Sequence, residues 1–344
     1  VGTGPWVLTQ TRRGEFDRFE RNPHYWGPKP GYGSVLVKVI SDPDSRAIAL
    51  QTGEIDLIQG ADGEISPGTF VRLRDSGFKT AISAPLATRT VAMNTGLAPT
   101  NELAVRQAIN QAVDKGTISA KVLHGQEPRA DALFASNMPY ADLGLKALPY
   151  DPEQAKKNLE AAGWKVPEGK RIREKNGQPL SIELVFLGPS ALQKNLAEII
   201  QGELAKVGID VKLRAEEDGA LVQRQREGKF GMIFADTWGA PYDPHSFVSS
   251  MRYAGHADYM AQLGLPMKAA IDRKIAEVLG ETDAGKRADD YREILTTLHD
   301  QAVYLPISHL TAISVSGKNV DNVQFGSTLF DVPFEVMHPT TGQP

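Results

Sequence analysis

The residues best suited to chemistry gather in one short stretch, TWGAPYDPHSF, from Thr237 to Phe247. It places a tryptophan, a tyrosine, an aspartate and a histidine on a loop broken by Gly and Pro, directly after the apolar run FGMIFAD. Such side chains could form an acid–base pair, a set of metal ligands or the wall of a pocket. His256 follows on a second predicted loop, between Tyr253 and Tyr259, where a neutral imidazole could close over a ligand and complete a metal's coordination shell.

Motifs typical of enzymes are missing from the sequence. It contains no G-x-S-x-G, P-loop, H-E-x-x-H or EF-hand pattern, and the absence of cysteine excludes thiolate nucleophiles and Cys-based zinc sites. The start VGTGPW lacks the third glycine of a dinucleotide fingerprint. We therefore predict no catalytic residue, no catalytic cofactor and no enzymatic activity. One histidine is not a zinc site, but it could be one ligand to a metal whose other donors come from a small chelator.

Composition narrows the function classes further. The chain has 344 residues, 41% of them hydrophobic, which is enough for two lobes with real cores. Its formal net charge is only −4, and its Lys and Arg residues are dispersed. Neither a nucleic-acid partner nor a polybasic membrane surface is indicated.

The elements that must position these residues are of mixed α/β type. Asp42, Pro43 and Gly53 mark the start and end of a helix, and Asp151, Pro152 and Gly163 repeat the device. Apolar runs between Ser181 and Asp236 alternate with helical periodicity, so we expect β-α-β order and a largely parallel sheet. Two long helices are predicted near residues 268–279 and 285–301, followed by further strand. The predicted connections between lobes are residues 84–94 and 304–310, which would cross twice and form a hinge.

Several segments resemble the extracellular solute-binding proteins of peptide/nickel ABC importers. They are VGTGPWVL, ERNPHYWGPKP, VISDPDSRAIALQTGEIDL, NELAVRQAINQAVDK and YDPEQAKKNLEAAGW, and their order and spacing match along almost the whole chain. The segment GMIFADTWGAPYDPHSFVSSMR is most similar to the nickel-binding branch of this class.

This resemblance implies a periplasmic-binding-protein-like α/β fold in which two lobes close on solute. Residues 1–86 and 310–344 would be a remnant of lobe I, and residues 87–309 would be lobe II. The class begins well upstream of VGTGPW, so we expect the first lobe to be incomplete and the signal peptide to be absent from this chain. The implied location is the periplasm, the implied partner is an ABC permease of the inner membrane, and the protein is expected to be a monomer. A missing amino-terminal fragment is a possible further partner.

The resemblance also assigns the opening loop. Peptide-binding members carry an Asp after the Trp that pairs with the peptide's ammonium group, whereas this chain has Ala240 and Pro241 there. What remains is aromatic surface from Trp238 and Tyr242, suited to shielding a small chelate. His256 would then give a closing nitrogen to Ni²⁺ already wrapped by an organic chelator such as histidine, and Arg252 could neutralise a chelator carboxylate, although a surface role for Arg252 is equally open.

The predicted function is therefore the binding of a nickel chelate for import. Two alternatives remain open at this point: a di- or oligopeptide-binding protein of the same class and, more remotely, a hydrolase. The other histidines are expected to be structural; they are His24, His124, His245, His299, His309 and His338.

Overall fold

We describe the protein from a computed structural model, in which the described residues are 2–61, 63–239 and 244–340. The chain forms two compact units, one comprising Val1–Ala84 with Thr311–Pro344 and the other Pro85–Leu310. These boundaries lie close to those expected for the two lobes; the assignment of the units to lobes I and II stays a prediction.

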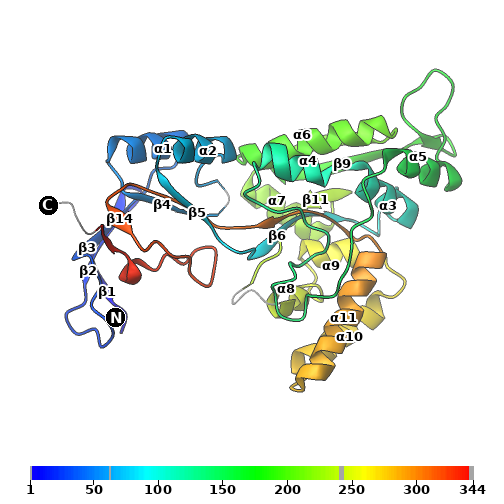
Figure 1. Ribbon diagram of the computed structural model, residues 1–344. Helices are drawn as coiled ribbons and strands as arrows, with labels where there is room; N and C mark the ends of the chain where they lie inside the picture. The colour runs from blue at the N-terminus through cyan, green and yellow to red at the C-terminus, as the bar shows by residue number, and fades with distance from the viewer. Residues whose placement is uncertain (1, 62, 240–243, 341–344) are drawn as a thin grey trace. The chain divides into compact units, whose positions relative to one another are not determined.

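The first unit is built from two three-stranded antiparallel sheets, a two-stranded sheet of β14 and β15, and a pair of helices (Figure 1). Strands β4, β13 and β5 pair in that order, and helices α1 and α2 supply Leu50, Phe70 and Leu73 to the core against Ile58 and Val315. The other three-stranded sheet has the order β1-β2-β3. The bounds are β1 Trp6–Arg12, β2 Phe16–Arg21, β3 Ser34–Lys38, α1 Pro43–Thr52, β4 Leu57–Gly60, α2 Pro67–Asp75, β5 Lys79–Ile82, β13 Ile313–Ser316, β14 Val320–Asp321, η2 Phe334–Val336 and β15 His338–Pro339.

The second unit is a five-stranded sheet between two layers of helices, with strand order β10-β9-β11-β6-β12. Strands β9, β10 and β11 are parallel, while β6 runs antiparallel to both β11 and β12. The strand bounds are β6 Ala87–Met93, β7 Glu174–Lys175, β8 Gln178–Pro179, β9 Ser181–Leu187, β10 Asp210–Glu216, β11 Met232–Phe234 and β12 Tyr304–Leu310. The helix bounds are α3 Leu103–Ala112, α4 Lys115–Thr117, η1 Ile118–Val122, α5 Pro152–Ala161, α6 Ala191–Lys206, α7 Asp218–Glu227, α8 Pro244–Ser250, α9 Ala257–Gln262, α10 Lys268–Gly280 and α11 Ala284–Asp300.

Helices cover both faces of this sheet. Because successive side chains of a strand point to opposite sides, each inner strand contributes residues to two cores. In β9, Leu184 packs in a core with residues of α3, α5 and α6, whereas Val185 packs in a core with residues of α8 to α11. Figure 1 shows the same division, with α3 and α6 on one face of the sheet and α9 to α11 on the other.

Local sequence signals agree closely with the helix ends. Asp42 accepts a hydrogen bond from the Ser45 N–H, Pro43 opens α1, and Gly53 ends it in the left-handed conformation. Asp151 caps α5 in the same way through the Gln154 N–H. The predicted α/β class and the parallel order of β9, β10 and β11 are confirmed.

The two stretches expected to connect the lobes belong mainly to the second unit. Most of residues 84–94 and all of residues 304–310 form β6 and β12, which are buried strands inside the second unit. The chain passes from one unit to the other just before β6, between Ala84 and Pro85, and directly after β12, between Leu310 and Thr311. Whether these connections act as a hinge stays a prediction. Among the described residues, no helix is long and apolar enough to cross a bilayer.

Packing on both faces predicts that the sheet interior dominates the stability of the second unit. Replacing Leu184, which is fully buried, by Ala should lower the free energy of unfolding by about 2–5 kcal/mol, through lost burial and a residual cavity. The matched change Leu97→Ala, at a side chain that is 43% exposed, should cost less than about 0.5 kcal/mol. Urea denaturation of both variants measures this, and equal losses would contradict the layered core.

Candidate functional site

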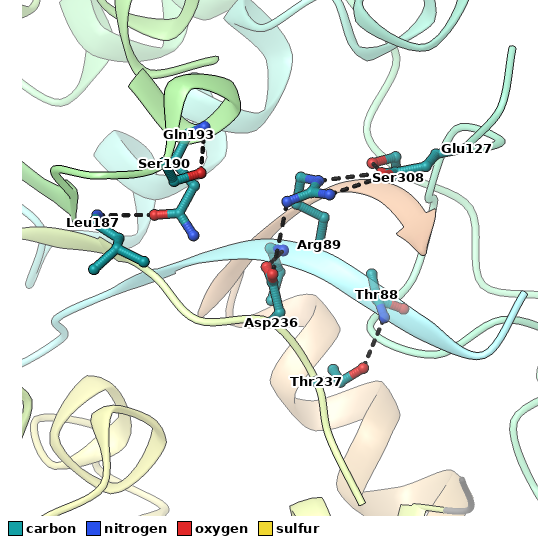
Figure 2. Close-up of polar contacts among 10 residues, drawn as sticks. Thr88, Arg89, Glu127, Leu187, Ser190, Gln193, Asp236, Thr237 and Ser308 are labelled. Carbon is teal, nitrogen blue, oxygen red and sulfur yellow. Dashed lines mark hydrogen bonds and ion pairs between the residues drawn. The ribbon is translucent and has the colours of Figure 1, made fainter. Parts of the chain in front are cut away.

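The segment that carries Trp238 continues the pairing of β11 with β6 beyond the end of the strand. Ala235 N–H donates to the Thr90 carbonyl at 2.9 Å, and Thr237 N–H donates to the Thr88 carbonyl at 2.9 Å. The Thr237 hydroxyl oxygen accepts from Thr88 N–H at 2.8 Å, as Figure 2 shows. Trp238 therefore leaves the sheet from a backbone that is fixed on one side.

Trp238 and His256 form a stacked ring pair. Their ring centroids are 6.1 Å apart and their planes are inclined by 27°. Trp238 also meets the edge of the fully buried Phe247 at 6.2 Å, with an interplanar angle of 78°. Trp238 is nevertheless 46% exposed and His256 is exposed, so neither ring is a core residue. The pair offers a flat aromatic surface and an accessible imidazole at one place.

His256 is held at the start of α9, where its backbone forms the N-cap and its side chain makes no capping hydrogen bond. The first turn of the helix is anchored below it. Asp258 accepts a hydrogen bond from the Tyr304 hydroxyl at 2.9 Å, and Gln262 Nε2 donates to the same oxygen at 3.1 Å. Burial raises the pKa of Asp258 to about 7. This buried network ties α9 to β12 and leaves the His256 ring available.

The other two predicted site residues are Tyr242 and Arg252. Tyr242 lies outside the described residues. Arg252 is half-buried in the turn after α8, and its guanidinium makes no hydrogen bond or ion pair with another residue in the described ranges. Burial lowers the pKa of Lys268, and the nearby positive charge of Arg252 adds to that effect. In the part of the chain that the structure describes, no contact joins Arg252 to the ring pair.

The remaining histidines do not form a metal centre. Within residues 2–61, 63–239 and 244–340 there is no group of three or more His, Asp or Glu that could hold a metal ion. His299 bonds to the Lys146 carbonyl, and His309 bonds to the Thr88 hydroxyl at 3.0 Å.

A buried charge network beside the site was not predicted from the sequence. Arg89 on β6 is fully buried and binds Glu127 through two hydrogen bonds, Nε–Oε2 at 3.1 Å and Nη2–Oε1 at 2.8 Å. Its Nη1 lies 3.7 Å from Oδ2 of Asp236, and the Ser308 hydroxyl donates to Glu127 (Figure 2). The available signal was an arginine in the middle of the buried strand ATRTVAM, which requires a buried anionic partner.

Comparisons with known proteins agree with the fold. The model of bacterial extracellular solute-binding proteins, family 5 Middle, matches residues 1–259. The nickel-binding periplasmic protein of Escherichia coli K12 is 50% identical over 340 residues, covering 98% of this chain and 65% of that protein. The crystal structure of NikA from Brucella suis in complex with Fe(III)-EDTA is 55% identical with a TM-score of 0.96, covering 98% of this chain and 68% of that one. The probable di/tripeptide-binding protein 5 of Pseudomonas aeruginosa UCBPP-PA14 is 26% identical, covering 94% of this chain and 59% of that protein.

The chain therefore spans just under two thirds of the length of the E. coli relative. The fold class predicted from the sequence, α/β of the periplasmic-binding-protein type, is confirmed by the match to the Brucella structure.

The environment of His309 predicts a loss of stability in acid. Burial lowers the pKa of His309 to about 4, against the partly compensating charges of Asp131 and Glu127. The unfolded chain then binds a proton at higher pH than the folded chain does, so stability present above pH 6.5 is lost as the pH falls toward 4. The shift corresponds to about 3 kcal/mol. Urea denaturation from pH 7 to pH 4 measures the free energy of unfolding. It should decline less steeply with falling pH for His309→Gln than for the unmodified chain and for the exposed control His24→Gln. Identical slopes for the three proteins would contradict this role of His309.

Proposed function

Because this chain belongs to the bacterial extracellular solute-binding proteins of family 5, we propose that the whole protein binds nickel as a small-molecule chelate in the periplasm. It then delivers the chelate to an ABC permease in the inner membrane, acting as a monomer. The observation that carries the proposal is the 50% identity with a nickel-binding periplasmic protein, which extends over 98% of this chain. Membership of a family of solute-binding proteins supports binding rather than catalysis.

The ring pair supports a chelate rather than a bare ion. Ni²⁺ favours nitrogen ligands, and imidazole is among the protein ligands that suit it. His256 offers one such nitrogen, and among the described residues no group of three or more His, Asp or Glu could hold a metal ion. An organic chelator with amine, imidazole or carboxylate donors would supply the remaining ligands, and free histidine has this chemistry.

The other residues have complementary roles in this proposal. The exposed face of Trp238 covers one side of the chelate and excludes water, and Tyr242 is proposed to extend that wall. The guanidinium of Arg252 neutralises a carboxylate of the chelator. Residues 1–86 with 310–344 and residues 87–309 are proposed to be parts of two lobes that close on the solute, with the chelate favouring the closed form.

Isothermal titration tests the requirement for a chelator. The full-length protein should bind Ni²⁺ much more tightly in the presence of excess L-histidine than as the bare ion, because His256 is the one protein ligand proposed for the metal. Equally tight binding of bare Ni²⁺ would contradict the chelate model. A shift of the melting temperature by dipeptides but not by nickel–histidine would identify a peptide receptor instead.

The role of His256 is tested by replacing it with Ala. Loss of a direct ligand should weaken binding of the nickel–histidine chelate at least about tenfold, since even indirect contacts to metal ligands can have effects of that size. The control His24→Ala removes an exposed imidazole from the other unit and should leave the affinity unchanged. Equal affinities for both variants would remove His256 from the site.

A further inference from the structure

Arg89 is an unusual residue to find at the centre of β6. Its side chain is fully buried, whereas its neighbours Thr88 and Thr90 are small and Val91 is apolar. Removing a guanidinium from water costs several kcal/mol, and the cost is recovered only by well-formed ion pairs. Apolar residues of similar volume often match or exceed the stability of a buried ion pair, so bulk stability alone does not account for this arrangement.

The geometry around Arg89 points toward Trp238. Glu127 occupies two donors of the guanidinium and is itself nearly buried, with 10% of its side chain exposed. The third nitrogen, Nη1, faces Asp236, which lies two residues before Trp238. Asp236 Oδ1 also accepts a hydrogen bond from the Thr90 backbone N–H at 3.3 Å. Arg89 and the β6 backbone therefore hold the same carboxylate from two directions (Figure 2).

We infer that Arg89, Glu127 and Asp236 are positioning residues that fix the orientation of Trp238 in its ring pair with His256. Glu127 orients the planar guanidinium, the guanidinium attracts Asp236, and Asp236 restrains the short segment that ends at Trp238. The inference rests on the proposed function, because that function gives the ring pair its role in chelate binding. The orientation of Trp238 can nevertheless be measured without any ligand.

Two substitutions at Asp236 separate the ion pair from the hydrogen bond. Asp236→Asn keeps an oxygen that can accept from Thr90 N–H but removes the charge that faces Arg89. Asp236→Ala removes both. The control Asp210→Asn changes a carboxylate of similar exposure, 28% against 26%, on the edge strand β10 of the same sheet, where it contacts Ser181 and Lys212.

Acrylamide quenching of tryptophan fluorescence gives the readout. The contribution of Trp238 is the difference between each variant and the same variant carrying Trp238→Phe. If the ion pair restrains Trp238, Asp236→Asn and Asp236→Ala should raise its quenching constant similarly. The rise is at most about twofold, because the residue already exposes 46% of its surface. Asp210→Asn should leave it unchanged. A quenching constant for Asp236→Asn equal to that of the unmodified chain would overturn the role of the ion pair.

Arg89→Lys tests whether the flat guanidinium group, with its several N–H donors in fixed directions, is required. Lysine keeps the positive charge but presents it as a point, so it cannot bind both Glu127 oxygens and face Asp236 together. The quenching constant of Trp238 should rise as in Asp236→Asn. Urea denaturation identifies a variant that fails to fold, and in that case the Asp236 variants alone decide the inference.

Titration with nickel and L-histidine keeps this inference distinct from the proposed function. A rise in Trp238 quenching in the variants, together with failure of the unmodified chain to bind the chelate, would support the positioning role and contradict the function. Chelate binding with unchanged quenching in the Asp236 and Arg89 variants would do the reverse.

Discussion

The pairing of β6 with a neighbour on each side is the constraint on which the second unit depends. It joins residues near 90 to residues near 233 and 305, so three distant parts of the chain meet in one sheet. Because β6 lies inside the sheet, its alternate side chains enter both cores, with Val91 and Met93 on one face and Ala92 on the other. The same strand carries Arg89 and provides the backbone that fixes the approach to Trp238.

The site follows from where these strands end. Trp238 leaves the sheet at the carboxyl end of β11, and His256 begins a helix anchored to β12 through Asp258 and Tyr304. Two residues 18 positions apart in the sequence thereby become a ring pair. Its single imidazole and broad aromatic face suit recognition of a preassembled complex better than construction of a metal site, which needs several protein ligands.

Sequence reasoning succeeded where the cause of a structure is local. Asp42, Pro43 and Gly53 act within one helix, and the apolar runs of β9 and β11 reflect burial on both faces of the sheet. Both kinds of signal can be recognised in the sequence without knowledge of the tertiary structure. The stacking of Trp238 on His256 and the contact between Arg89 and Asp236 depend on strand order, which local patterns do not specify. For the same reason β6 and β12 were read as connections, although they are a buried interior strand and a buried edge strand of the sheet.

Nickel-induced broadening of tryptophan indole signals in a ¹H–¹⁵N NMR spectrum tests whether the nickel chelate binds beside Trp238. The chain has four tryptophans, and paramagnetic Ni²⁺ broadens the signals of nuclei close to it. With nickel and excess L-histidine, the account predicts selective loss of the Trp238 signal while those of Trp6, Trp26 and Trp164 persist. Persistence of the Trp238 signal at saturating chelate, or earlier loss of another indole signal, would contradict it.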